Sequence, residues 1–309
     1  MKVGLIPLDC KLPPLSLMKA ASYHRSRGDS VEVCLPMFYQ SYDICYCCSL
    51  FDYTPKPHFD SRVICGGPGY DANSRLPEEI ENCQPDYGLF PGLDFSYQKL
   101  TTGCIRRCPF CICRDHEFAD VEPLQEINPD AKYIYLLDNN FFASKNWKKN
   151  IDILKSYRLP VYFQGIDARI VSKNKEMLNA LAKIKITTQG LYMAWDDPAI
   201  DMTETFQRII EIVPPSRLTV YVLIGYYNEP IEKDLWRVEA LDGMKIDPYV
   251  MPFDRKDKYQ SAFSAWVNQK PAFRSHRWED YFENRTGLRW EDFRRKAVTS
   301  RQGLGQKEM

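Results

Sequence analysis

The chain has 309 residues, of which 44% are hydrophobic, and its 41 basic residues balance 41 acidic ones. This length is enough to bury one large core or two smaller ones, and the balanced charge gives no general affinity for nucleic acid or for an anionic membrane. No apolar stretch is long enough to span a bilayer, and charge and proline break the N-terminal segment too early for a signal peptide, so we expect a cytoplasmic protein.

The first quarter of the sequence predicts a small parallel sheet. An apolar run is followed by apolar residues at helical spacing, and then by three short runs rich in Val, Ile and aromatic residues. The expected strands are residues 2–8, 30–36, 43–50 and 62–67, and the expected helix is residues 15–28. Apolar strands joined through a helix are typical of an open Rossmann-like sheet, so we predict such a domain over residues 1–76.

Two further segments connect this domain to the rest of the chain. The stretch GGPGYD, residues 66–71, does not match the dinucleotide fingerprint. We interpret it as a turn after a strand, with phosphate binding as the alternative. Residues 77–95 are polar and contain three prolines, and we predict that they form a linker.

Strand and helix patterns then alternate over residues 96–254. The expected strands are residues 96–102, 132–138, 161–171, 186–195, 218–227 and 245–253, and the expected helices are residues 146–158, 174–184, 204–213 and 230–241. Crossovers of this length join parallel strands. The sequence therefore predicts an α/β fold in which a partial (β/α)6 TIM-like barrel follows the Rossmann-like domain and precedes a helical C-terminal tail. In such barrels the chemistry takes place at the carboxyl ends of the strands.

A cysteine-rich segment, TTGCIRRCPFCICRD, follows the first of these strands. All eleven cysteines lie in the first 113 residues. An odd number in a chain without a secretory signal argues against a disulfide framework and favours metal binding or redox work. Cys104, Cys108 and Cys111 have the spacing CxxxCxxC. Three thiolates are one ligand short of a structural zinc site, but they can hold a cubic iron–sulfur cluster with one iron open to a small ligand.

The stretch CIRRCPFC, with Phe110 directly before the third cysteine, resembles the signature of the radical S-adenosylmethionine (SAM) superfamily, and the resemblance covers residues 94–254. It implies a [4Fe-4S] cluster held by Cys104, Cys108 and Cys111, whose open iron is chelated by the amino and carboxylate groups of SAM. It also implies that an electron donor such as flavodoxin or ferredoxin drives cleavage of SAM to a 5′-deoxyadenosyl radical. That radical would abstract hydrogen from a substrate that the sequence does not identify.

The same resemblance implies where SAM binds. Asp138, Asn139 and Asn140 end the second strand and are candidates for the SAM amino group, although the family's usual glycine-glycine-glutamate is absent; a helix-capping turn is the alternative. Arg169, at the end of the third strand, is a candidate for the SAM carboxylate, with a surface ion pair as the alternative. The other candidates are Phe110, Gln164, Asp167, Tyr192, Ile224 and Gly225, of which the last three belong to segments that resemble those cradling ribose and adenine.

Cys113 has no place in the three-cysteine pattern. We interpret it as a small packing thiol, and the alternative is a hydrogen donor or a thiol that supports the cluster ligands. If Cys113 or His116 served as a fourth ligand, the segment would instead be a zinc site in a nucleic-acid-binding module. That alternative leaves the repeated strand–helix pattern unexplained.

The N-terminal domain, placed ahead of a radical SAM barrel, resembles the cobalamin-binding class. That class uses an Asp-x-His-x-x-Gly loop, which is absent here, and we interpret His24 and His58 as structural or exposed. We therefore predict a degenerate domain without histidine-ligated cobalamin. Binding of base-off cobalamin is the alternative for this domain. For the reaction, the alternative is that the enzyme modifies a nucleic acid or protein, as enzymes of the cobalamin or methylthiotransferase classes do. Cys45, Cys47 and Cys48 are interpreted as strand core, with an auxiliary metal as the alternative.

Residues 255–309 form a basic, aromatic tail, with thirteen Lys and Arg against seven Asp and Glu. The sequence from Arg277 predicts two short amphipathic helices joined at Thr286 and Gly287, and residues 301–309 are predicted to be disordered. We interpret the tail as a helical cap that shapes substrate access to the barrel. A basic surface that binds nucleic acid is the alternative. Because we favour the helical cap, we favour a small-molecule or peptide substrate over nucleic acid. No membrane partner is expected.

Overall fold

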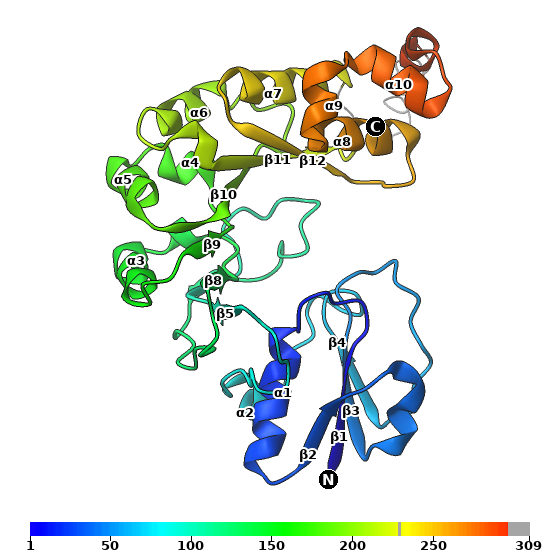
Figure 1. Ribbon diagram of the computed structural model, residues 1–309, viewed down its shortest axis with the longest axis vertical. Coiled ribbons are helices and arrows are strands. Elements are labelled where there is room, and N and C mark those ends of the chain that lie inside the picture. The colour runs from blue at the N-terminus through cyan, green and yellow to red at the C-terminus, as the bar shows by residue number, and fades with distance from the viewer. Residues whose placement is uncertain (228–229, 296–309) are drawn as a thin grey trace. The chain divides into compact units, whose positions relative to one another are not determined.

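The computed structural model of the protein describes residues 1–227 and 230–295 (Figure 1). The chain is a mixed α/β protein that divides into two compact units. The first unit comprises Met1–Asn140 and Lys148–Val161, and the second comprises Phe141–Trp147 and Tyr162–Met309. Within the described ranges, no helix combines the length and the apolar character that crossing a membrane requires.

A four-stranded parallel sheet forms the N-terminal part of the first unit. Its strands β1 (Lys2–Pro7), β2 (Ser30–Val33), β3 (Ile44–Cys48) and β4 (Val63–Gly66) have the order β2-β1-β3-β4. Helix α1 (Leu15–Ser26) packs on one face, where Leu17 joins Val3 and Leu5 in the core, and the short helix η1 (Pro36–Ser41) borders the other. Because both faces of the sheet are covered, the central strands β1 and β3 are buried over most of their length, whereas the edge strand β2 carries the exposed Ser30 and Glu32. The predicted Rossmann-like parallel sheet is confirmed.

Residues 95–252 build a six-stranded sheet whose strands lie in sequence order (Figure 1). The strands are β5 (Phe95–Gln98), β8 (Tyr133–Leu136), β9 (Val161–Phe163), β10 (Ile186–Ala194), β11 (Leu218–Ile224) and β12 (Asp247–Pro252). The pairs β5–β8, β10–β11 and β11–β12 are parallel, as predicted for strands joined by helical crossovers. No sheet in the described ranges closes on itself, so the curved partial barrel stays a prediction.

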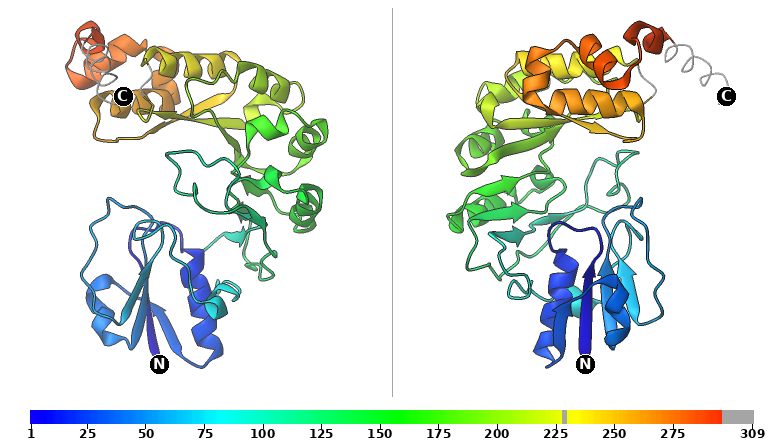
Figure 2. Two further views of the ribbon diagram at one scale, coloured as in Figure 1. Left: turned by 180° about the vertical axis from the view of Figure 1, so that it is seen from behind. Right: turned by 45° about the vertical axis from the view of Figure 1, so that its right-hand side comes forward.

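Four helices between these strands agree with the predicted pattern, namely α3 (Trp147–Ser156), α5 (Lys175–Lys183), α6 (Thr203–Ile210) and α7 (Glu232–Gly243). The short helix α4 (Ala168–Val171) lies where a strand was predicted. In the second unit, α5, α6 and α7 lie on one side of strands β10 to β12 (Figures 1 and 2). The buried side chains of β11, such as Val220 and Val222, face this helical layer, while the alternate residue Tyr221 is half-buried on the opposite face.

One predicted strand, residues 96–102, is interrupted. Its first part is β5, and its last two residues form β6 (Thr101–Thr102), which pairs antiparallel with β7 (Ala119–Asp120). The short helix α2 (Glu78–Glu81) lies within the predicted linker. The sequence pattern missed β7 because a two-residue strand leaves no periodicity to detect.

A second predicted strand, residues 161–171, is wrong beyond Phe163. Gly165 has a positive φ of 72°, a conformation that favours glycine. Asp167 then accepts a hydrogen bond from the Arg169 N–H at 3.0 Å and caps helix α4. A glycine and a capping aspartate therefore end β9 early.

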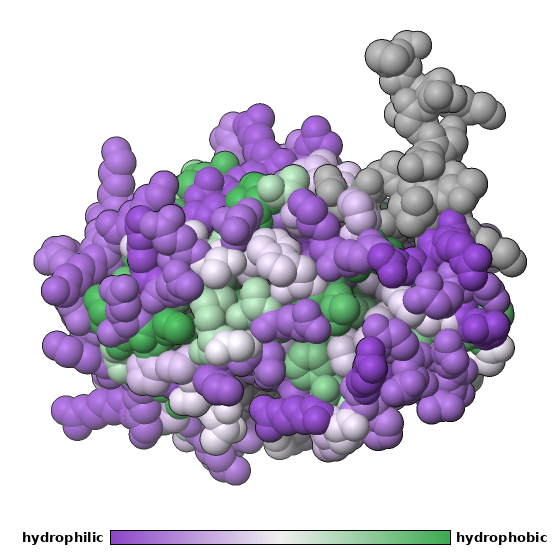
Figure 3. All heavy atoms as spheres, turned by 90° about the horizontal axis from the view of Figure 1, so that it is seen from above, coloured by the Kyte–Doolittle hydropathy of each residue, from purple (hydrophilic) through white to green (hydrophobic). Residues whose placement is uncertain are grey.

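The C-terminal tail packs as helices α8 (Lys258–Asn268), α9 (Lys270–Ser275) and α10 (Trp278–Thr286), and residues 290–295 are also helical. Gly287 ends α10 with a φ of 69°, which confirms the predicted junction. The tail's large aromatic side chains are buried, among them Trp266, Trp278, Phe282 and Trp290. Hydrophilic side chains dominate the face in Figure 3, with apolar ones in small patches between them. The predicted disordered end, residues 301–309, lies outside the described residues.

Candidate iron–sulfur site

The cysteine-rich segment is a loop closed at its base. Strands β6 and β7 pair Thr101 with Asp120 and Thr102 with Ala119, so the two ends of the loop formed by residues 103–118 lie side by side. Gly103 has a φ of 64°, and a Cβ there would overlap the carbonyl oxygen of Glu117. The loop starts at the carboxyl end of β5, where the sequence placed it.

Asp138 anchors the base of this loop. Its side chain is buried and accepts hydrogen bonds from the Leu100 N–H at 3.0 Å and the Thr101 hydroxyl at 2.7 Å. Burial raises the pKa of Asp138 to about 6, although these hydrogen bonds and the nearby Lys99 act in the opposite direction. Both carboxylate oxygens are engaged by the loop base, so Asp138 anchors the loop, and a contact of Asp138 with SAM stays a prediction.

The next two residues point their amides at cysteine sulfurs. Asn140 Nδ2 donates to Cys104 Sγ at 3.4 Å, and Asn139 Nδ2 donates to Cys113 Sγ at 3.3 Å. The sequence placed this Asp-Asn-Asn run at the site but assigned it to the SAM amino group. In the structure, all three residues serve the cysteine loop.

Backbone amides point at two of the sulfurs as well. The Arg106 N–H donates to Cys104 Sγ and the Cys113 N–H donates to Cys111 Sγ, each at 3.4 Å. A hydrogen bond with the Cys111 thiol, followed by burial, raises the pKa of Cys113. Cys108 is half-buried in the same loop, and its carbonyl accepts from the Cys111 N–H.

This donor set fits a cluster of iron and sulfide. Thiolates bound to iron carry negative charge, and N–H groups aimed at their sulfurs stabilise that charge and orient the ligands. Lys99, half-buried at the end of β5, adds a cation whose field acts on both Asp138 and Cys113, and burial lowers the pKa of Lys99. The sequence analysis missed Lys99 because the expected strand, residues 96–102, placed Lys99 in its middle, whereas β5 ends at Gln98.

A single metal ion is a different case from a cluster. Among residues 1–227 and 230–295, no three His, Cys, Asp or Glu side chains are grouped to hold one ion. In a four-iron cluster each thiolate binds a different iron, so its ligands need not converge on one point. His116, the other proposed zinc ligand, has Nε2 2.9 Å from the carbonyl oxygen of Ala72.

The second unit holds the remaining polar candidates at strand ends. Arg169 Nε lies 3.5 Å from Asp167 Oδ1, which is the ion pair given as the alternative interpretation. Gln164 follows β9 and is half-buried. Asp196, which the sequence analysis did not single out, follows β10 and accepts from the Leu223 N–H at 3.3 Å. Burial raises the pKa of Asp196 to about 6, while the charges of Arg237 and Arg169 act to lower it.

The three weaker candidates have distinct environments. Tyr192 is half-buried and stacks on Tyr221 with ring centroids 5.3 Å apart. Ile224 is a buried core residue. Gly225 has a φ of 84°, and a Cβ there would overlap the side chain of Gln260. Tyr192 therefore presents an aromatic surface on the sheet face away from the helices, whereas Ile224 and Gly225 serve packing.

A buried arginine fixes the ends of two strands in this unit. Arg237, fully buried in α7, donates to the carbonyls of Trp195, Asp196 and Leu223 at 2.8–3.0 Å. It also pairs with Asp234 at 2.6 Å, and Asp234 accepts from the Tyr259 hydroxyl at 2.9 Å. The sequence analysis missed this network because Arg237 lies in an ordinary helical pattern.

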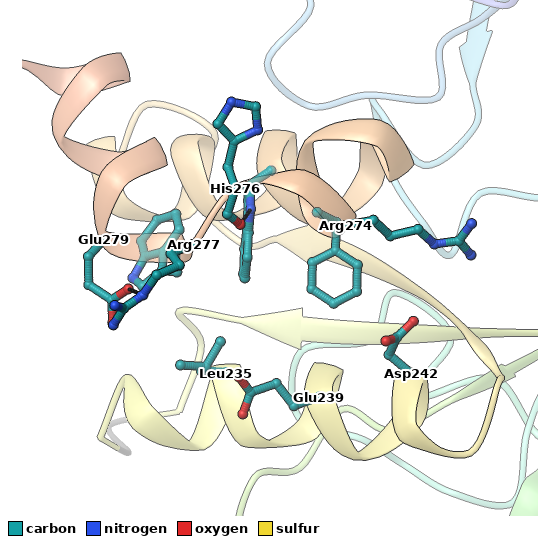
Figure 4. Close-up of a pocket in the computed structure, with 10 residues that line it drawn as sticks. Leu235, Glu239, Asp242, Arg274, His276, Arg277 and Glu279 are labelled. Atoms are coloured by element: carbon teal, nitrogen blue, oxygen red, sulfur yellow. Dashed lines mark hydrogen bonds and ion pairs between the residues drawn. The ribbon is translucent and has the colours of Figure 1, made fainter.

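A hollow of about 460 Å³ lies between α7 and the tail helices (Figure 4). Glu239 and Asp242 point into it, whereas Arg274 and His276 point away. Burial, and then repulsion from Glu279, raises the pKa of Glu239. The hollow is lined by Leu235, Glu239, Asp242, Trp266, Phe273, Arg274, His276, Arg277, Trp278 and Glu279.

Among the described residues, the segment that follows β1, residues 8–14, contains Asp9 and no histidine. Asp9 follows β1 and accepts from the Leu50 and Phe51 N–H groups and the Ser49 hydroxyl. His24 is buried in α1 and contacts Asp29 and Tyr46, which is a structural role. Cys45, Cys47 and Cys48 are buried in β3, as interpreted, and the Gly66–Asp71 stretch follows β4.

No protein-family model matches the chain, and a comparison with curated proteins finds no match.

Proposed function

We propose that the protein is a radical SAM enzyme in which Cys104, Cys108 and Cys111 hold a [4Fe-4S] cluster. One observation carries the proposal: the three-cysteine loop starts at the carboxyl end of the first strand of a six-stranded sheet. In that loop, side-chain and backbone amides point at the sulfurs. We also propose that this sheet is the curved partial barrel that the sequence predicts.

The chain's own residues hold and shield the cluster in this proposal. When bound, the cluster and SAM supply the radical chemistry, and the protein supplies position and electrostatics. Asp138 fixes the base of the loop, Asn140 and the Arg106 amide orient the Cys104 sulfur, and Lys99 offsets negative charge.

SAM is assigned to residues of the second unit. The Arg169 guanidinium uses Nε for Asp167, and we propose that its terminal nitrogens bind the SAM carboxylate. Asp196, a half-buried carboxylate in the segment that resembles the ribose cradle, is proposed to accept from a ribose hydroxyl. Gln164 and Tyr192 are proposed as further contacts, and a small molecule or peptide is proposed as substrate.

Anaerobic reconstitution tests the enzyme class. We expect about four irons and four sulfides per chain, with a broad visible absorbance that reduction bleaches. Cys104→Ala, Cys108→Ala or Cys111→Ala should abolish this absorbance, because each change removes an iron ligand. The control is Cys83→Ala, since the Cys83 thiol lies outside the loop and donates to the Glu79 carbonyl.

A second measurement links the cluster to SAM. The reduced protein should convert SAM to methionine and 5′-deoxyadenosine, detected by mass spectrometry, and the three cysteine variants should not. Stoichiometric zinc in place of iron, with Cys113 required for its binding, would show that the radical SAM proposal is wrong.

A further inference from the structure

Cys113 has the surroundings of a cluster ligand and not those of a packing thiol. The consecutive residues Asn139 and Asn140, at the end of β8, donate their amides to Cys113 and Cys104 respectively, at 3.3 and 3.4 Å. A thiol buried as core, such as Cys47 in β3, has an exposure of only 2%. Cys113, like Cys104, Cys108 and Cys111, is half-buried. The loop therefore contains four half-buried thiols.

The fourth thiol also lies beside the others. The Cys113 N–H donates to the Cys111 sulfur at 3.4 Å. A Cys113 sulfur bound to iron would thus have the Asn139 amide in place as a hydrogen-bond donor.

We propose that Cys113 is a fourth protein ligand, bound to the iron that the three-cysteine pattern leaves open, and that SAM displaces it. This inference rests on the proposed function. The Cys113 thiol releases its proton to solvent when its sulfur binds iron. When the amino and carboxylate groups of SAM take its place, the freed thiolate returns to Asn139 and regains a proton. No oxidation or reduction is involved.

The benefit of such a ligand is protection of the open iron. An iron without a protein ligand is the first to leave a cubic cluster on oxidation, and the product is a three-iron cluster with its own electron paramagnetic resonance (EPR) signal. Cys113 would hold this iron whenever SAM is absent. SAM must then compete with Cys113, so its apparent affinity is its intrinsic affinity multiplied by the fraction of cluster whose iron Cys113 does not occupy.

Iron retention tests the proposal directly. Wild type, Cys113→Ala and the control Cys83→Ala are reconstituted without SAM, freed of excess iron and exposed to ferricyanide. We expect wild type and Cys83→Ala to keep about four irons per chain, and Cys113→Ala to fall to about three with the three-iron EPR signal. SAM added before the oxidant should protect Cys113→Ala, and SAM should bind this variant more tightly than wild type.

Mössbauer spectroscopy of the ⁵⁷Fe-labelled wild type, in buffer free of thiols, does not depend on any variant. Without SAM we expect all irons to have sulfur-only coordination, and SAM should shift about a quarter of the iron. If about a quarter of the iron already had a distinct Mössbauer signal before SAM is added, the proposed role of Cys113 would be overturned. Equal iron loss from all three proteins would overturn it as well. In both cases the three-cysteine cluster, and with it the proposed function, would stand, whereas failure of wild type to form any cluster would overturn both.

Discussion

At the scale of single residues, the most informative run is Asp138, Asn139 and Asn140. The sequence could place these three at a strand's carboxyl end, and that position is confirmed. It could not assign their partners, because hydrogen bonds to Leu100, Cys104 and Cys113 depend on how a loop closes. Position followed from the strand pattern, whereas the contacts needed the three-dimensional structure.

Asp138→Asn should change how stability depends on pH. The pKa of Asp138 is about 6 in the folded protein, against 3.8 for an ordinary aspartate, so the folded state binds more protons between these values. Stability from this group is therefore fully present below pH 4 and is lost as pH rises to about 6, by about 3 kcal/mol at most. Thermal unfolding of the reduced apoprotein between pH 4.5 and 7.5 should show a smaller decline in the variant.

The variant also has a cost that does not depend on pH. Asparagine offers one acceptor oxygen where Asp138 uses two, so one hydrogen bond to the loop base is lost, at about 1–3 kcal/mol. Asp196→Asn is the comparison, since its pKa is also raised to about 6 but it lies outside the cysteine loop. Asp196→Asn should also reduce the fall in stability with rising pH, but it should leave cluster uptake unchanged. Parallel stability curves for wild type and Asp138→Asn would contradict the assignment.

At the scale of elements, the closure of the cysteine loop by β6 and β7 was the main feature absent from the sequence analysis. The long elements were predicted because their apolar residues repeat with a clear period. β7 has two exposed residues and no such period. The early end of β9 at Phe163 was missed for a related reason: the residues after it are apolar enough to continue a strand, and the turn depends on Gly165 and Asp167.

Gly103→Ala should prevent the loop from closing. The substitution is strained at a φ of 64°, and its Cβ would overlap Glu117 backbone atoms, so β6 and β7 cannot pair without a shift. We expect iron uptake to fall severalfold while the far-ultraviolet circular dichroism stays unchanged.

Gly92→Ala is the matched control for this prediction. Gly92 also has a positive φ, 84°, but no atom lies within 4 Å of a Cβ built there. The Gly92→Ala variant should lose only about 1 kcal/mol of stability, from the unfavourable backbone conformation, and should take up as much iron as wild type. Equal uptake by both variants would show that the closed base is not needed for the cluster.

At the scale of the whole molecule, the α/β class, the parallel sheets and the helical tail could all be predicted from the sequence. Balanced charge and ordinary hydrophobic content indicated a globular protein, and regular strand–helix repeats indicated parallel pairing. The polar interior could not be predicted, because a buried charge such as Arg237 gives no signal in a helical pattern. Such groups are recognised only through partners distant in the sequence.

Arg237→Met should destabilise the second unit. The change removes three hydrogen bonds to strand-end carbonyls and leaves Asp234 buried without its cation. Breaking a buried pair from one side costs about 3–5 kcal/mol. Urea unfolding followed by tryptophan fluorescence should show this loss, since Trp195 lies beside Arg237.

Arg208→Met is the control, because Arg208 pairs with Glu204 on the exposed surface of α6. Its effect should lie within the error of the measurement, since solvent screens exposed pairs. The double variant Arg237→Met with Asp234→Leu should recover part of the loss, because no unpaired charge is left inside, although the Tyr259 hydroxyl loses its acceptor. Equal losses in the single and double variants would show instead that the strand-end hydrogen bonds, and not the Asp234 charge, account for the stabilising role of Arg237.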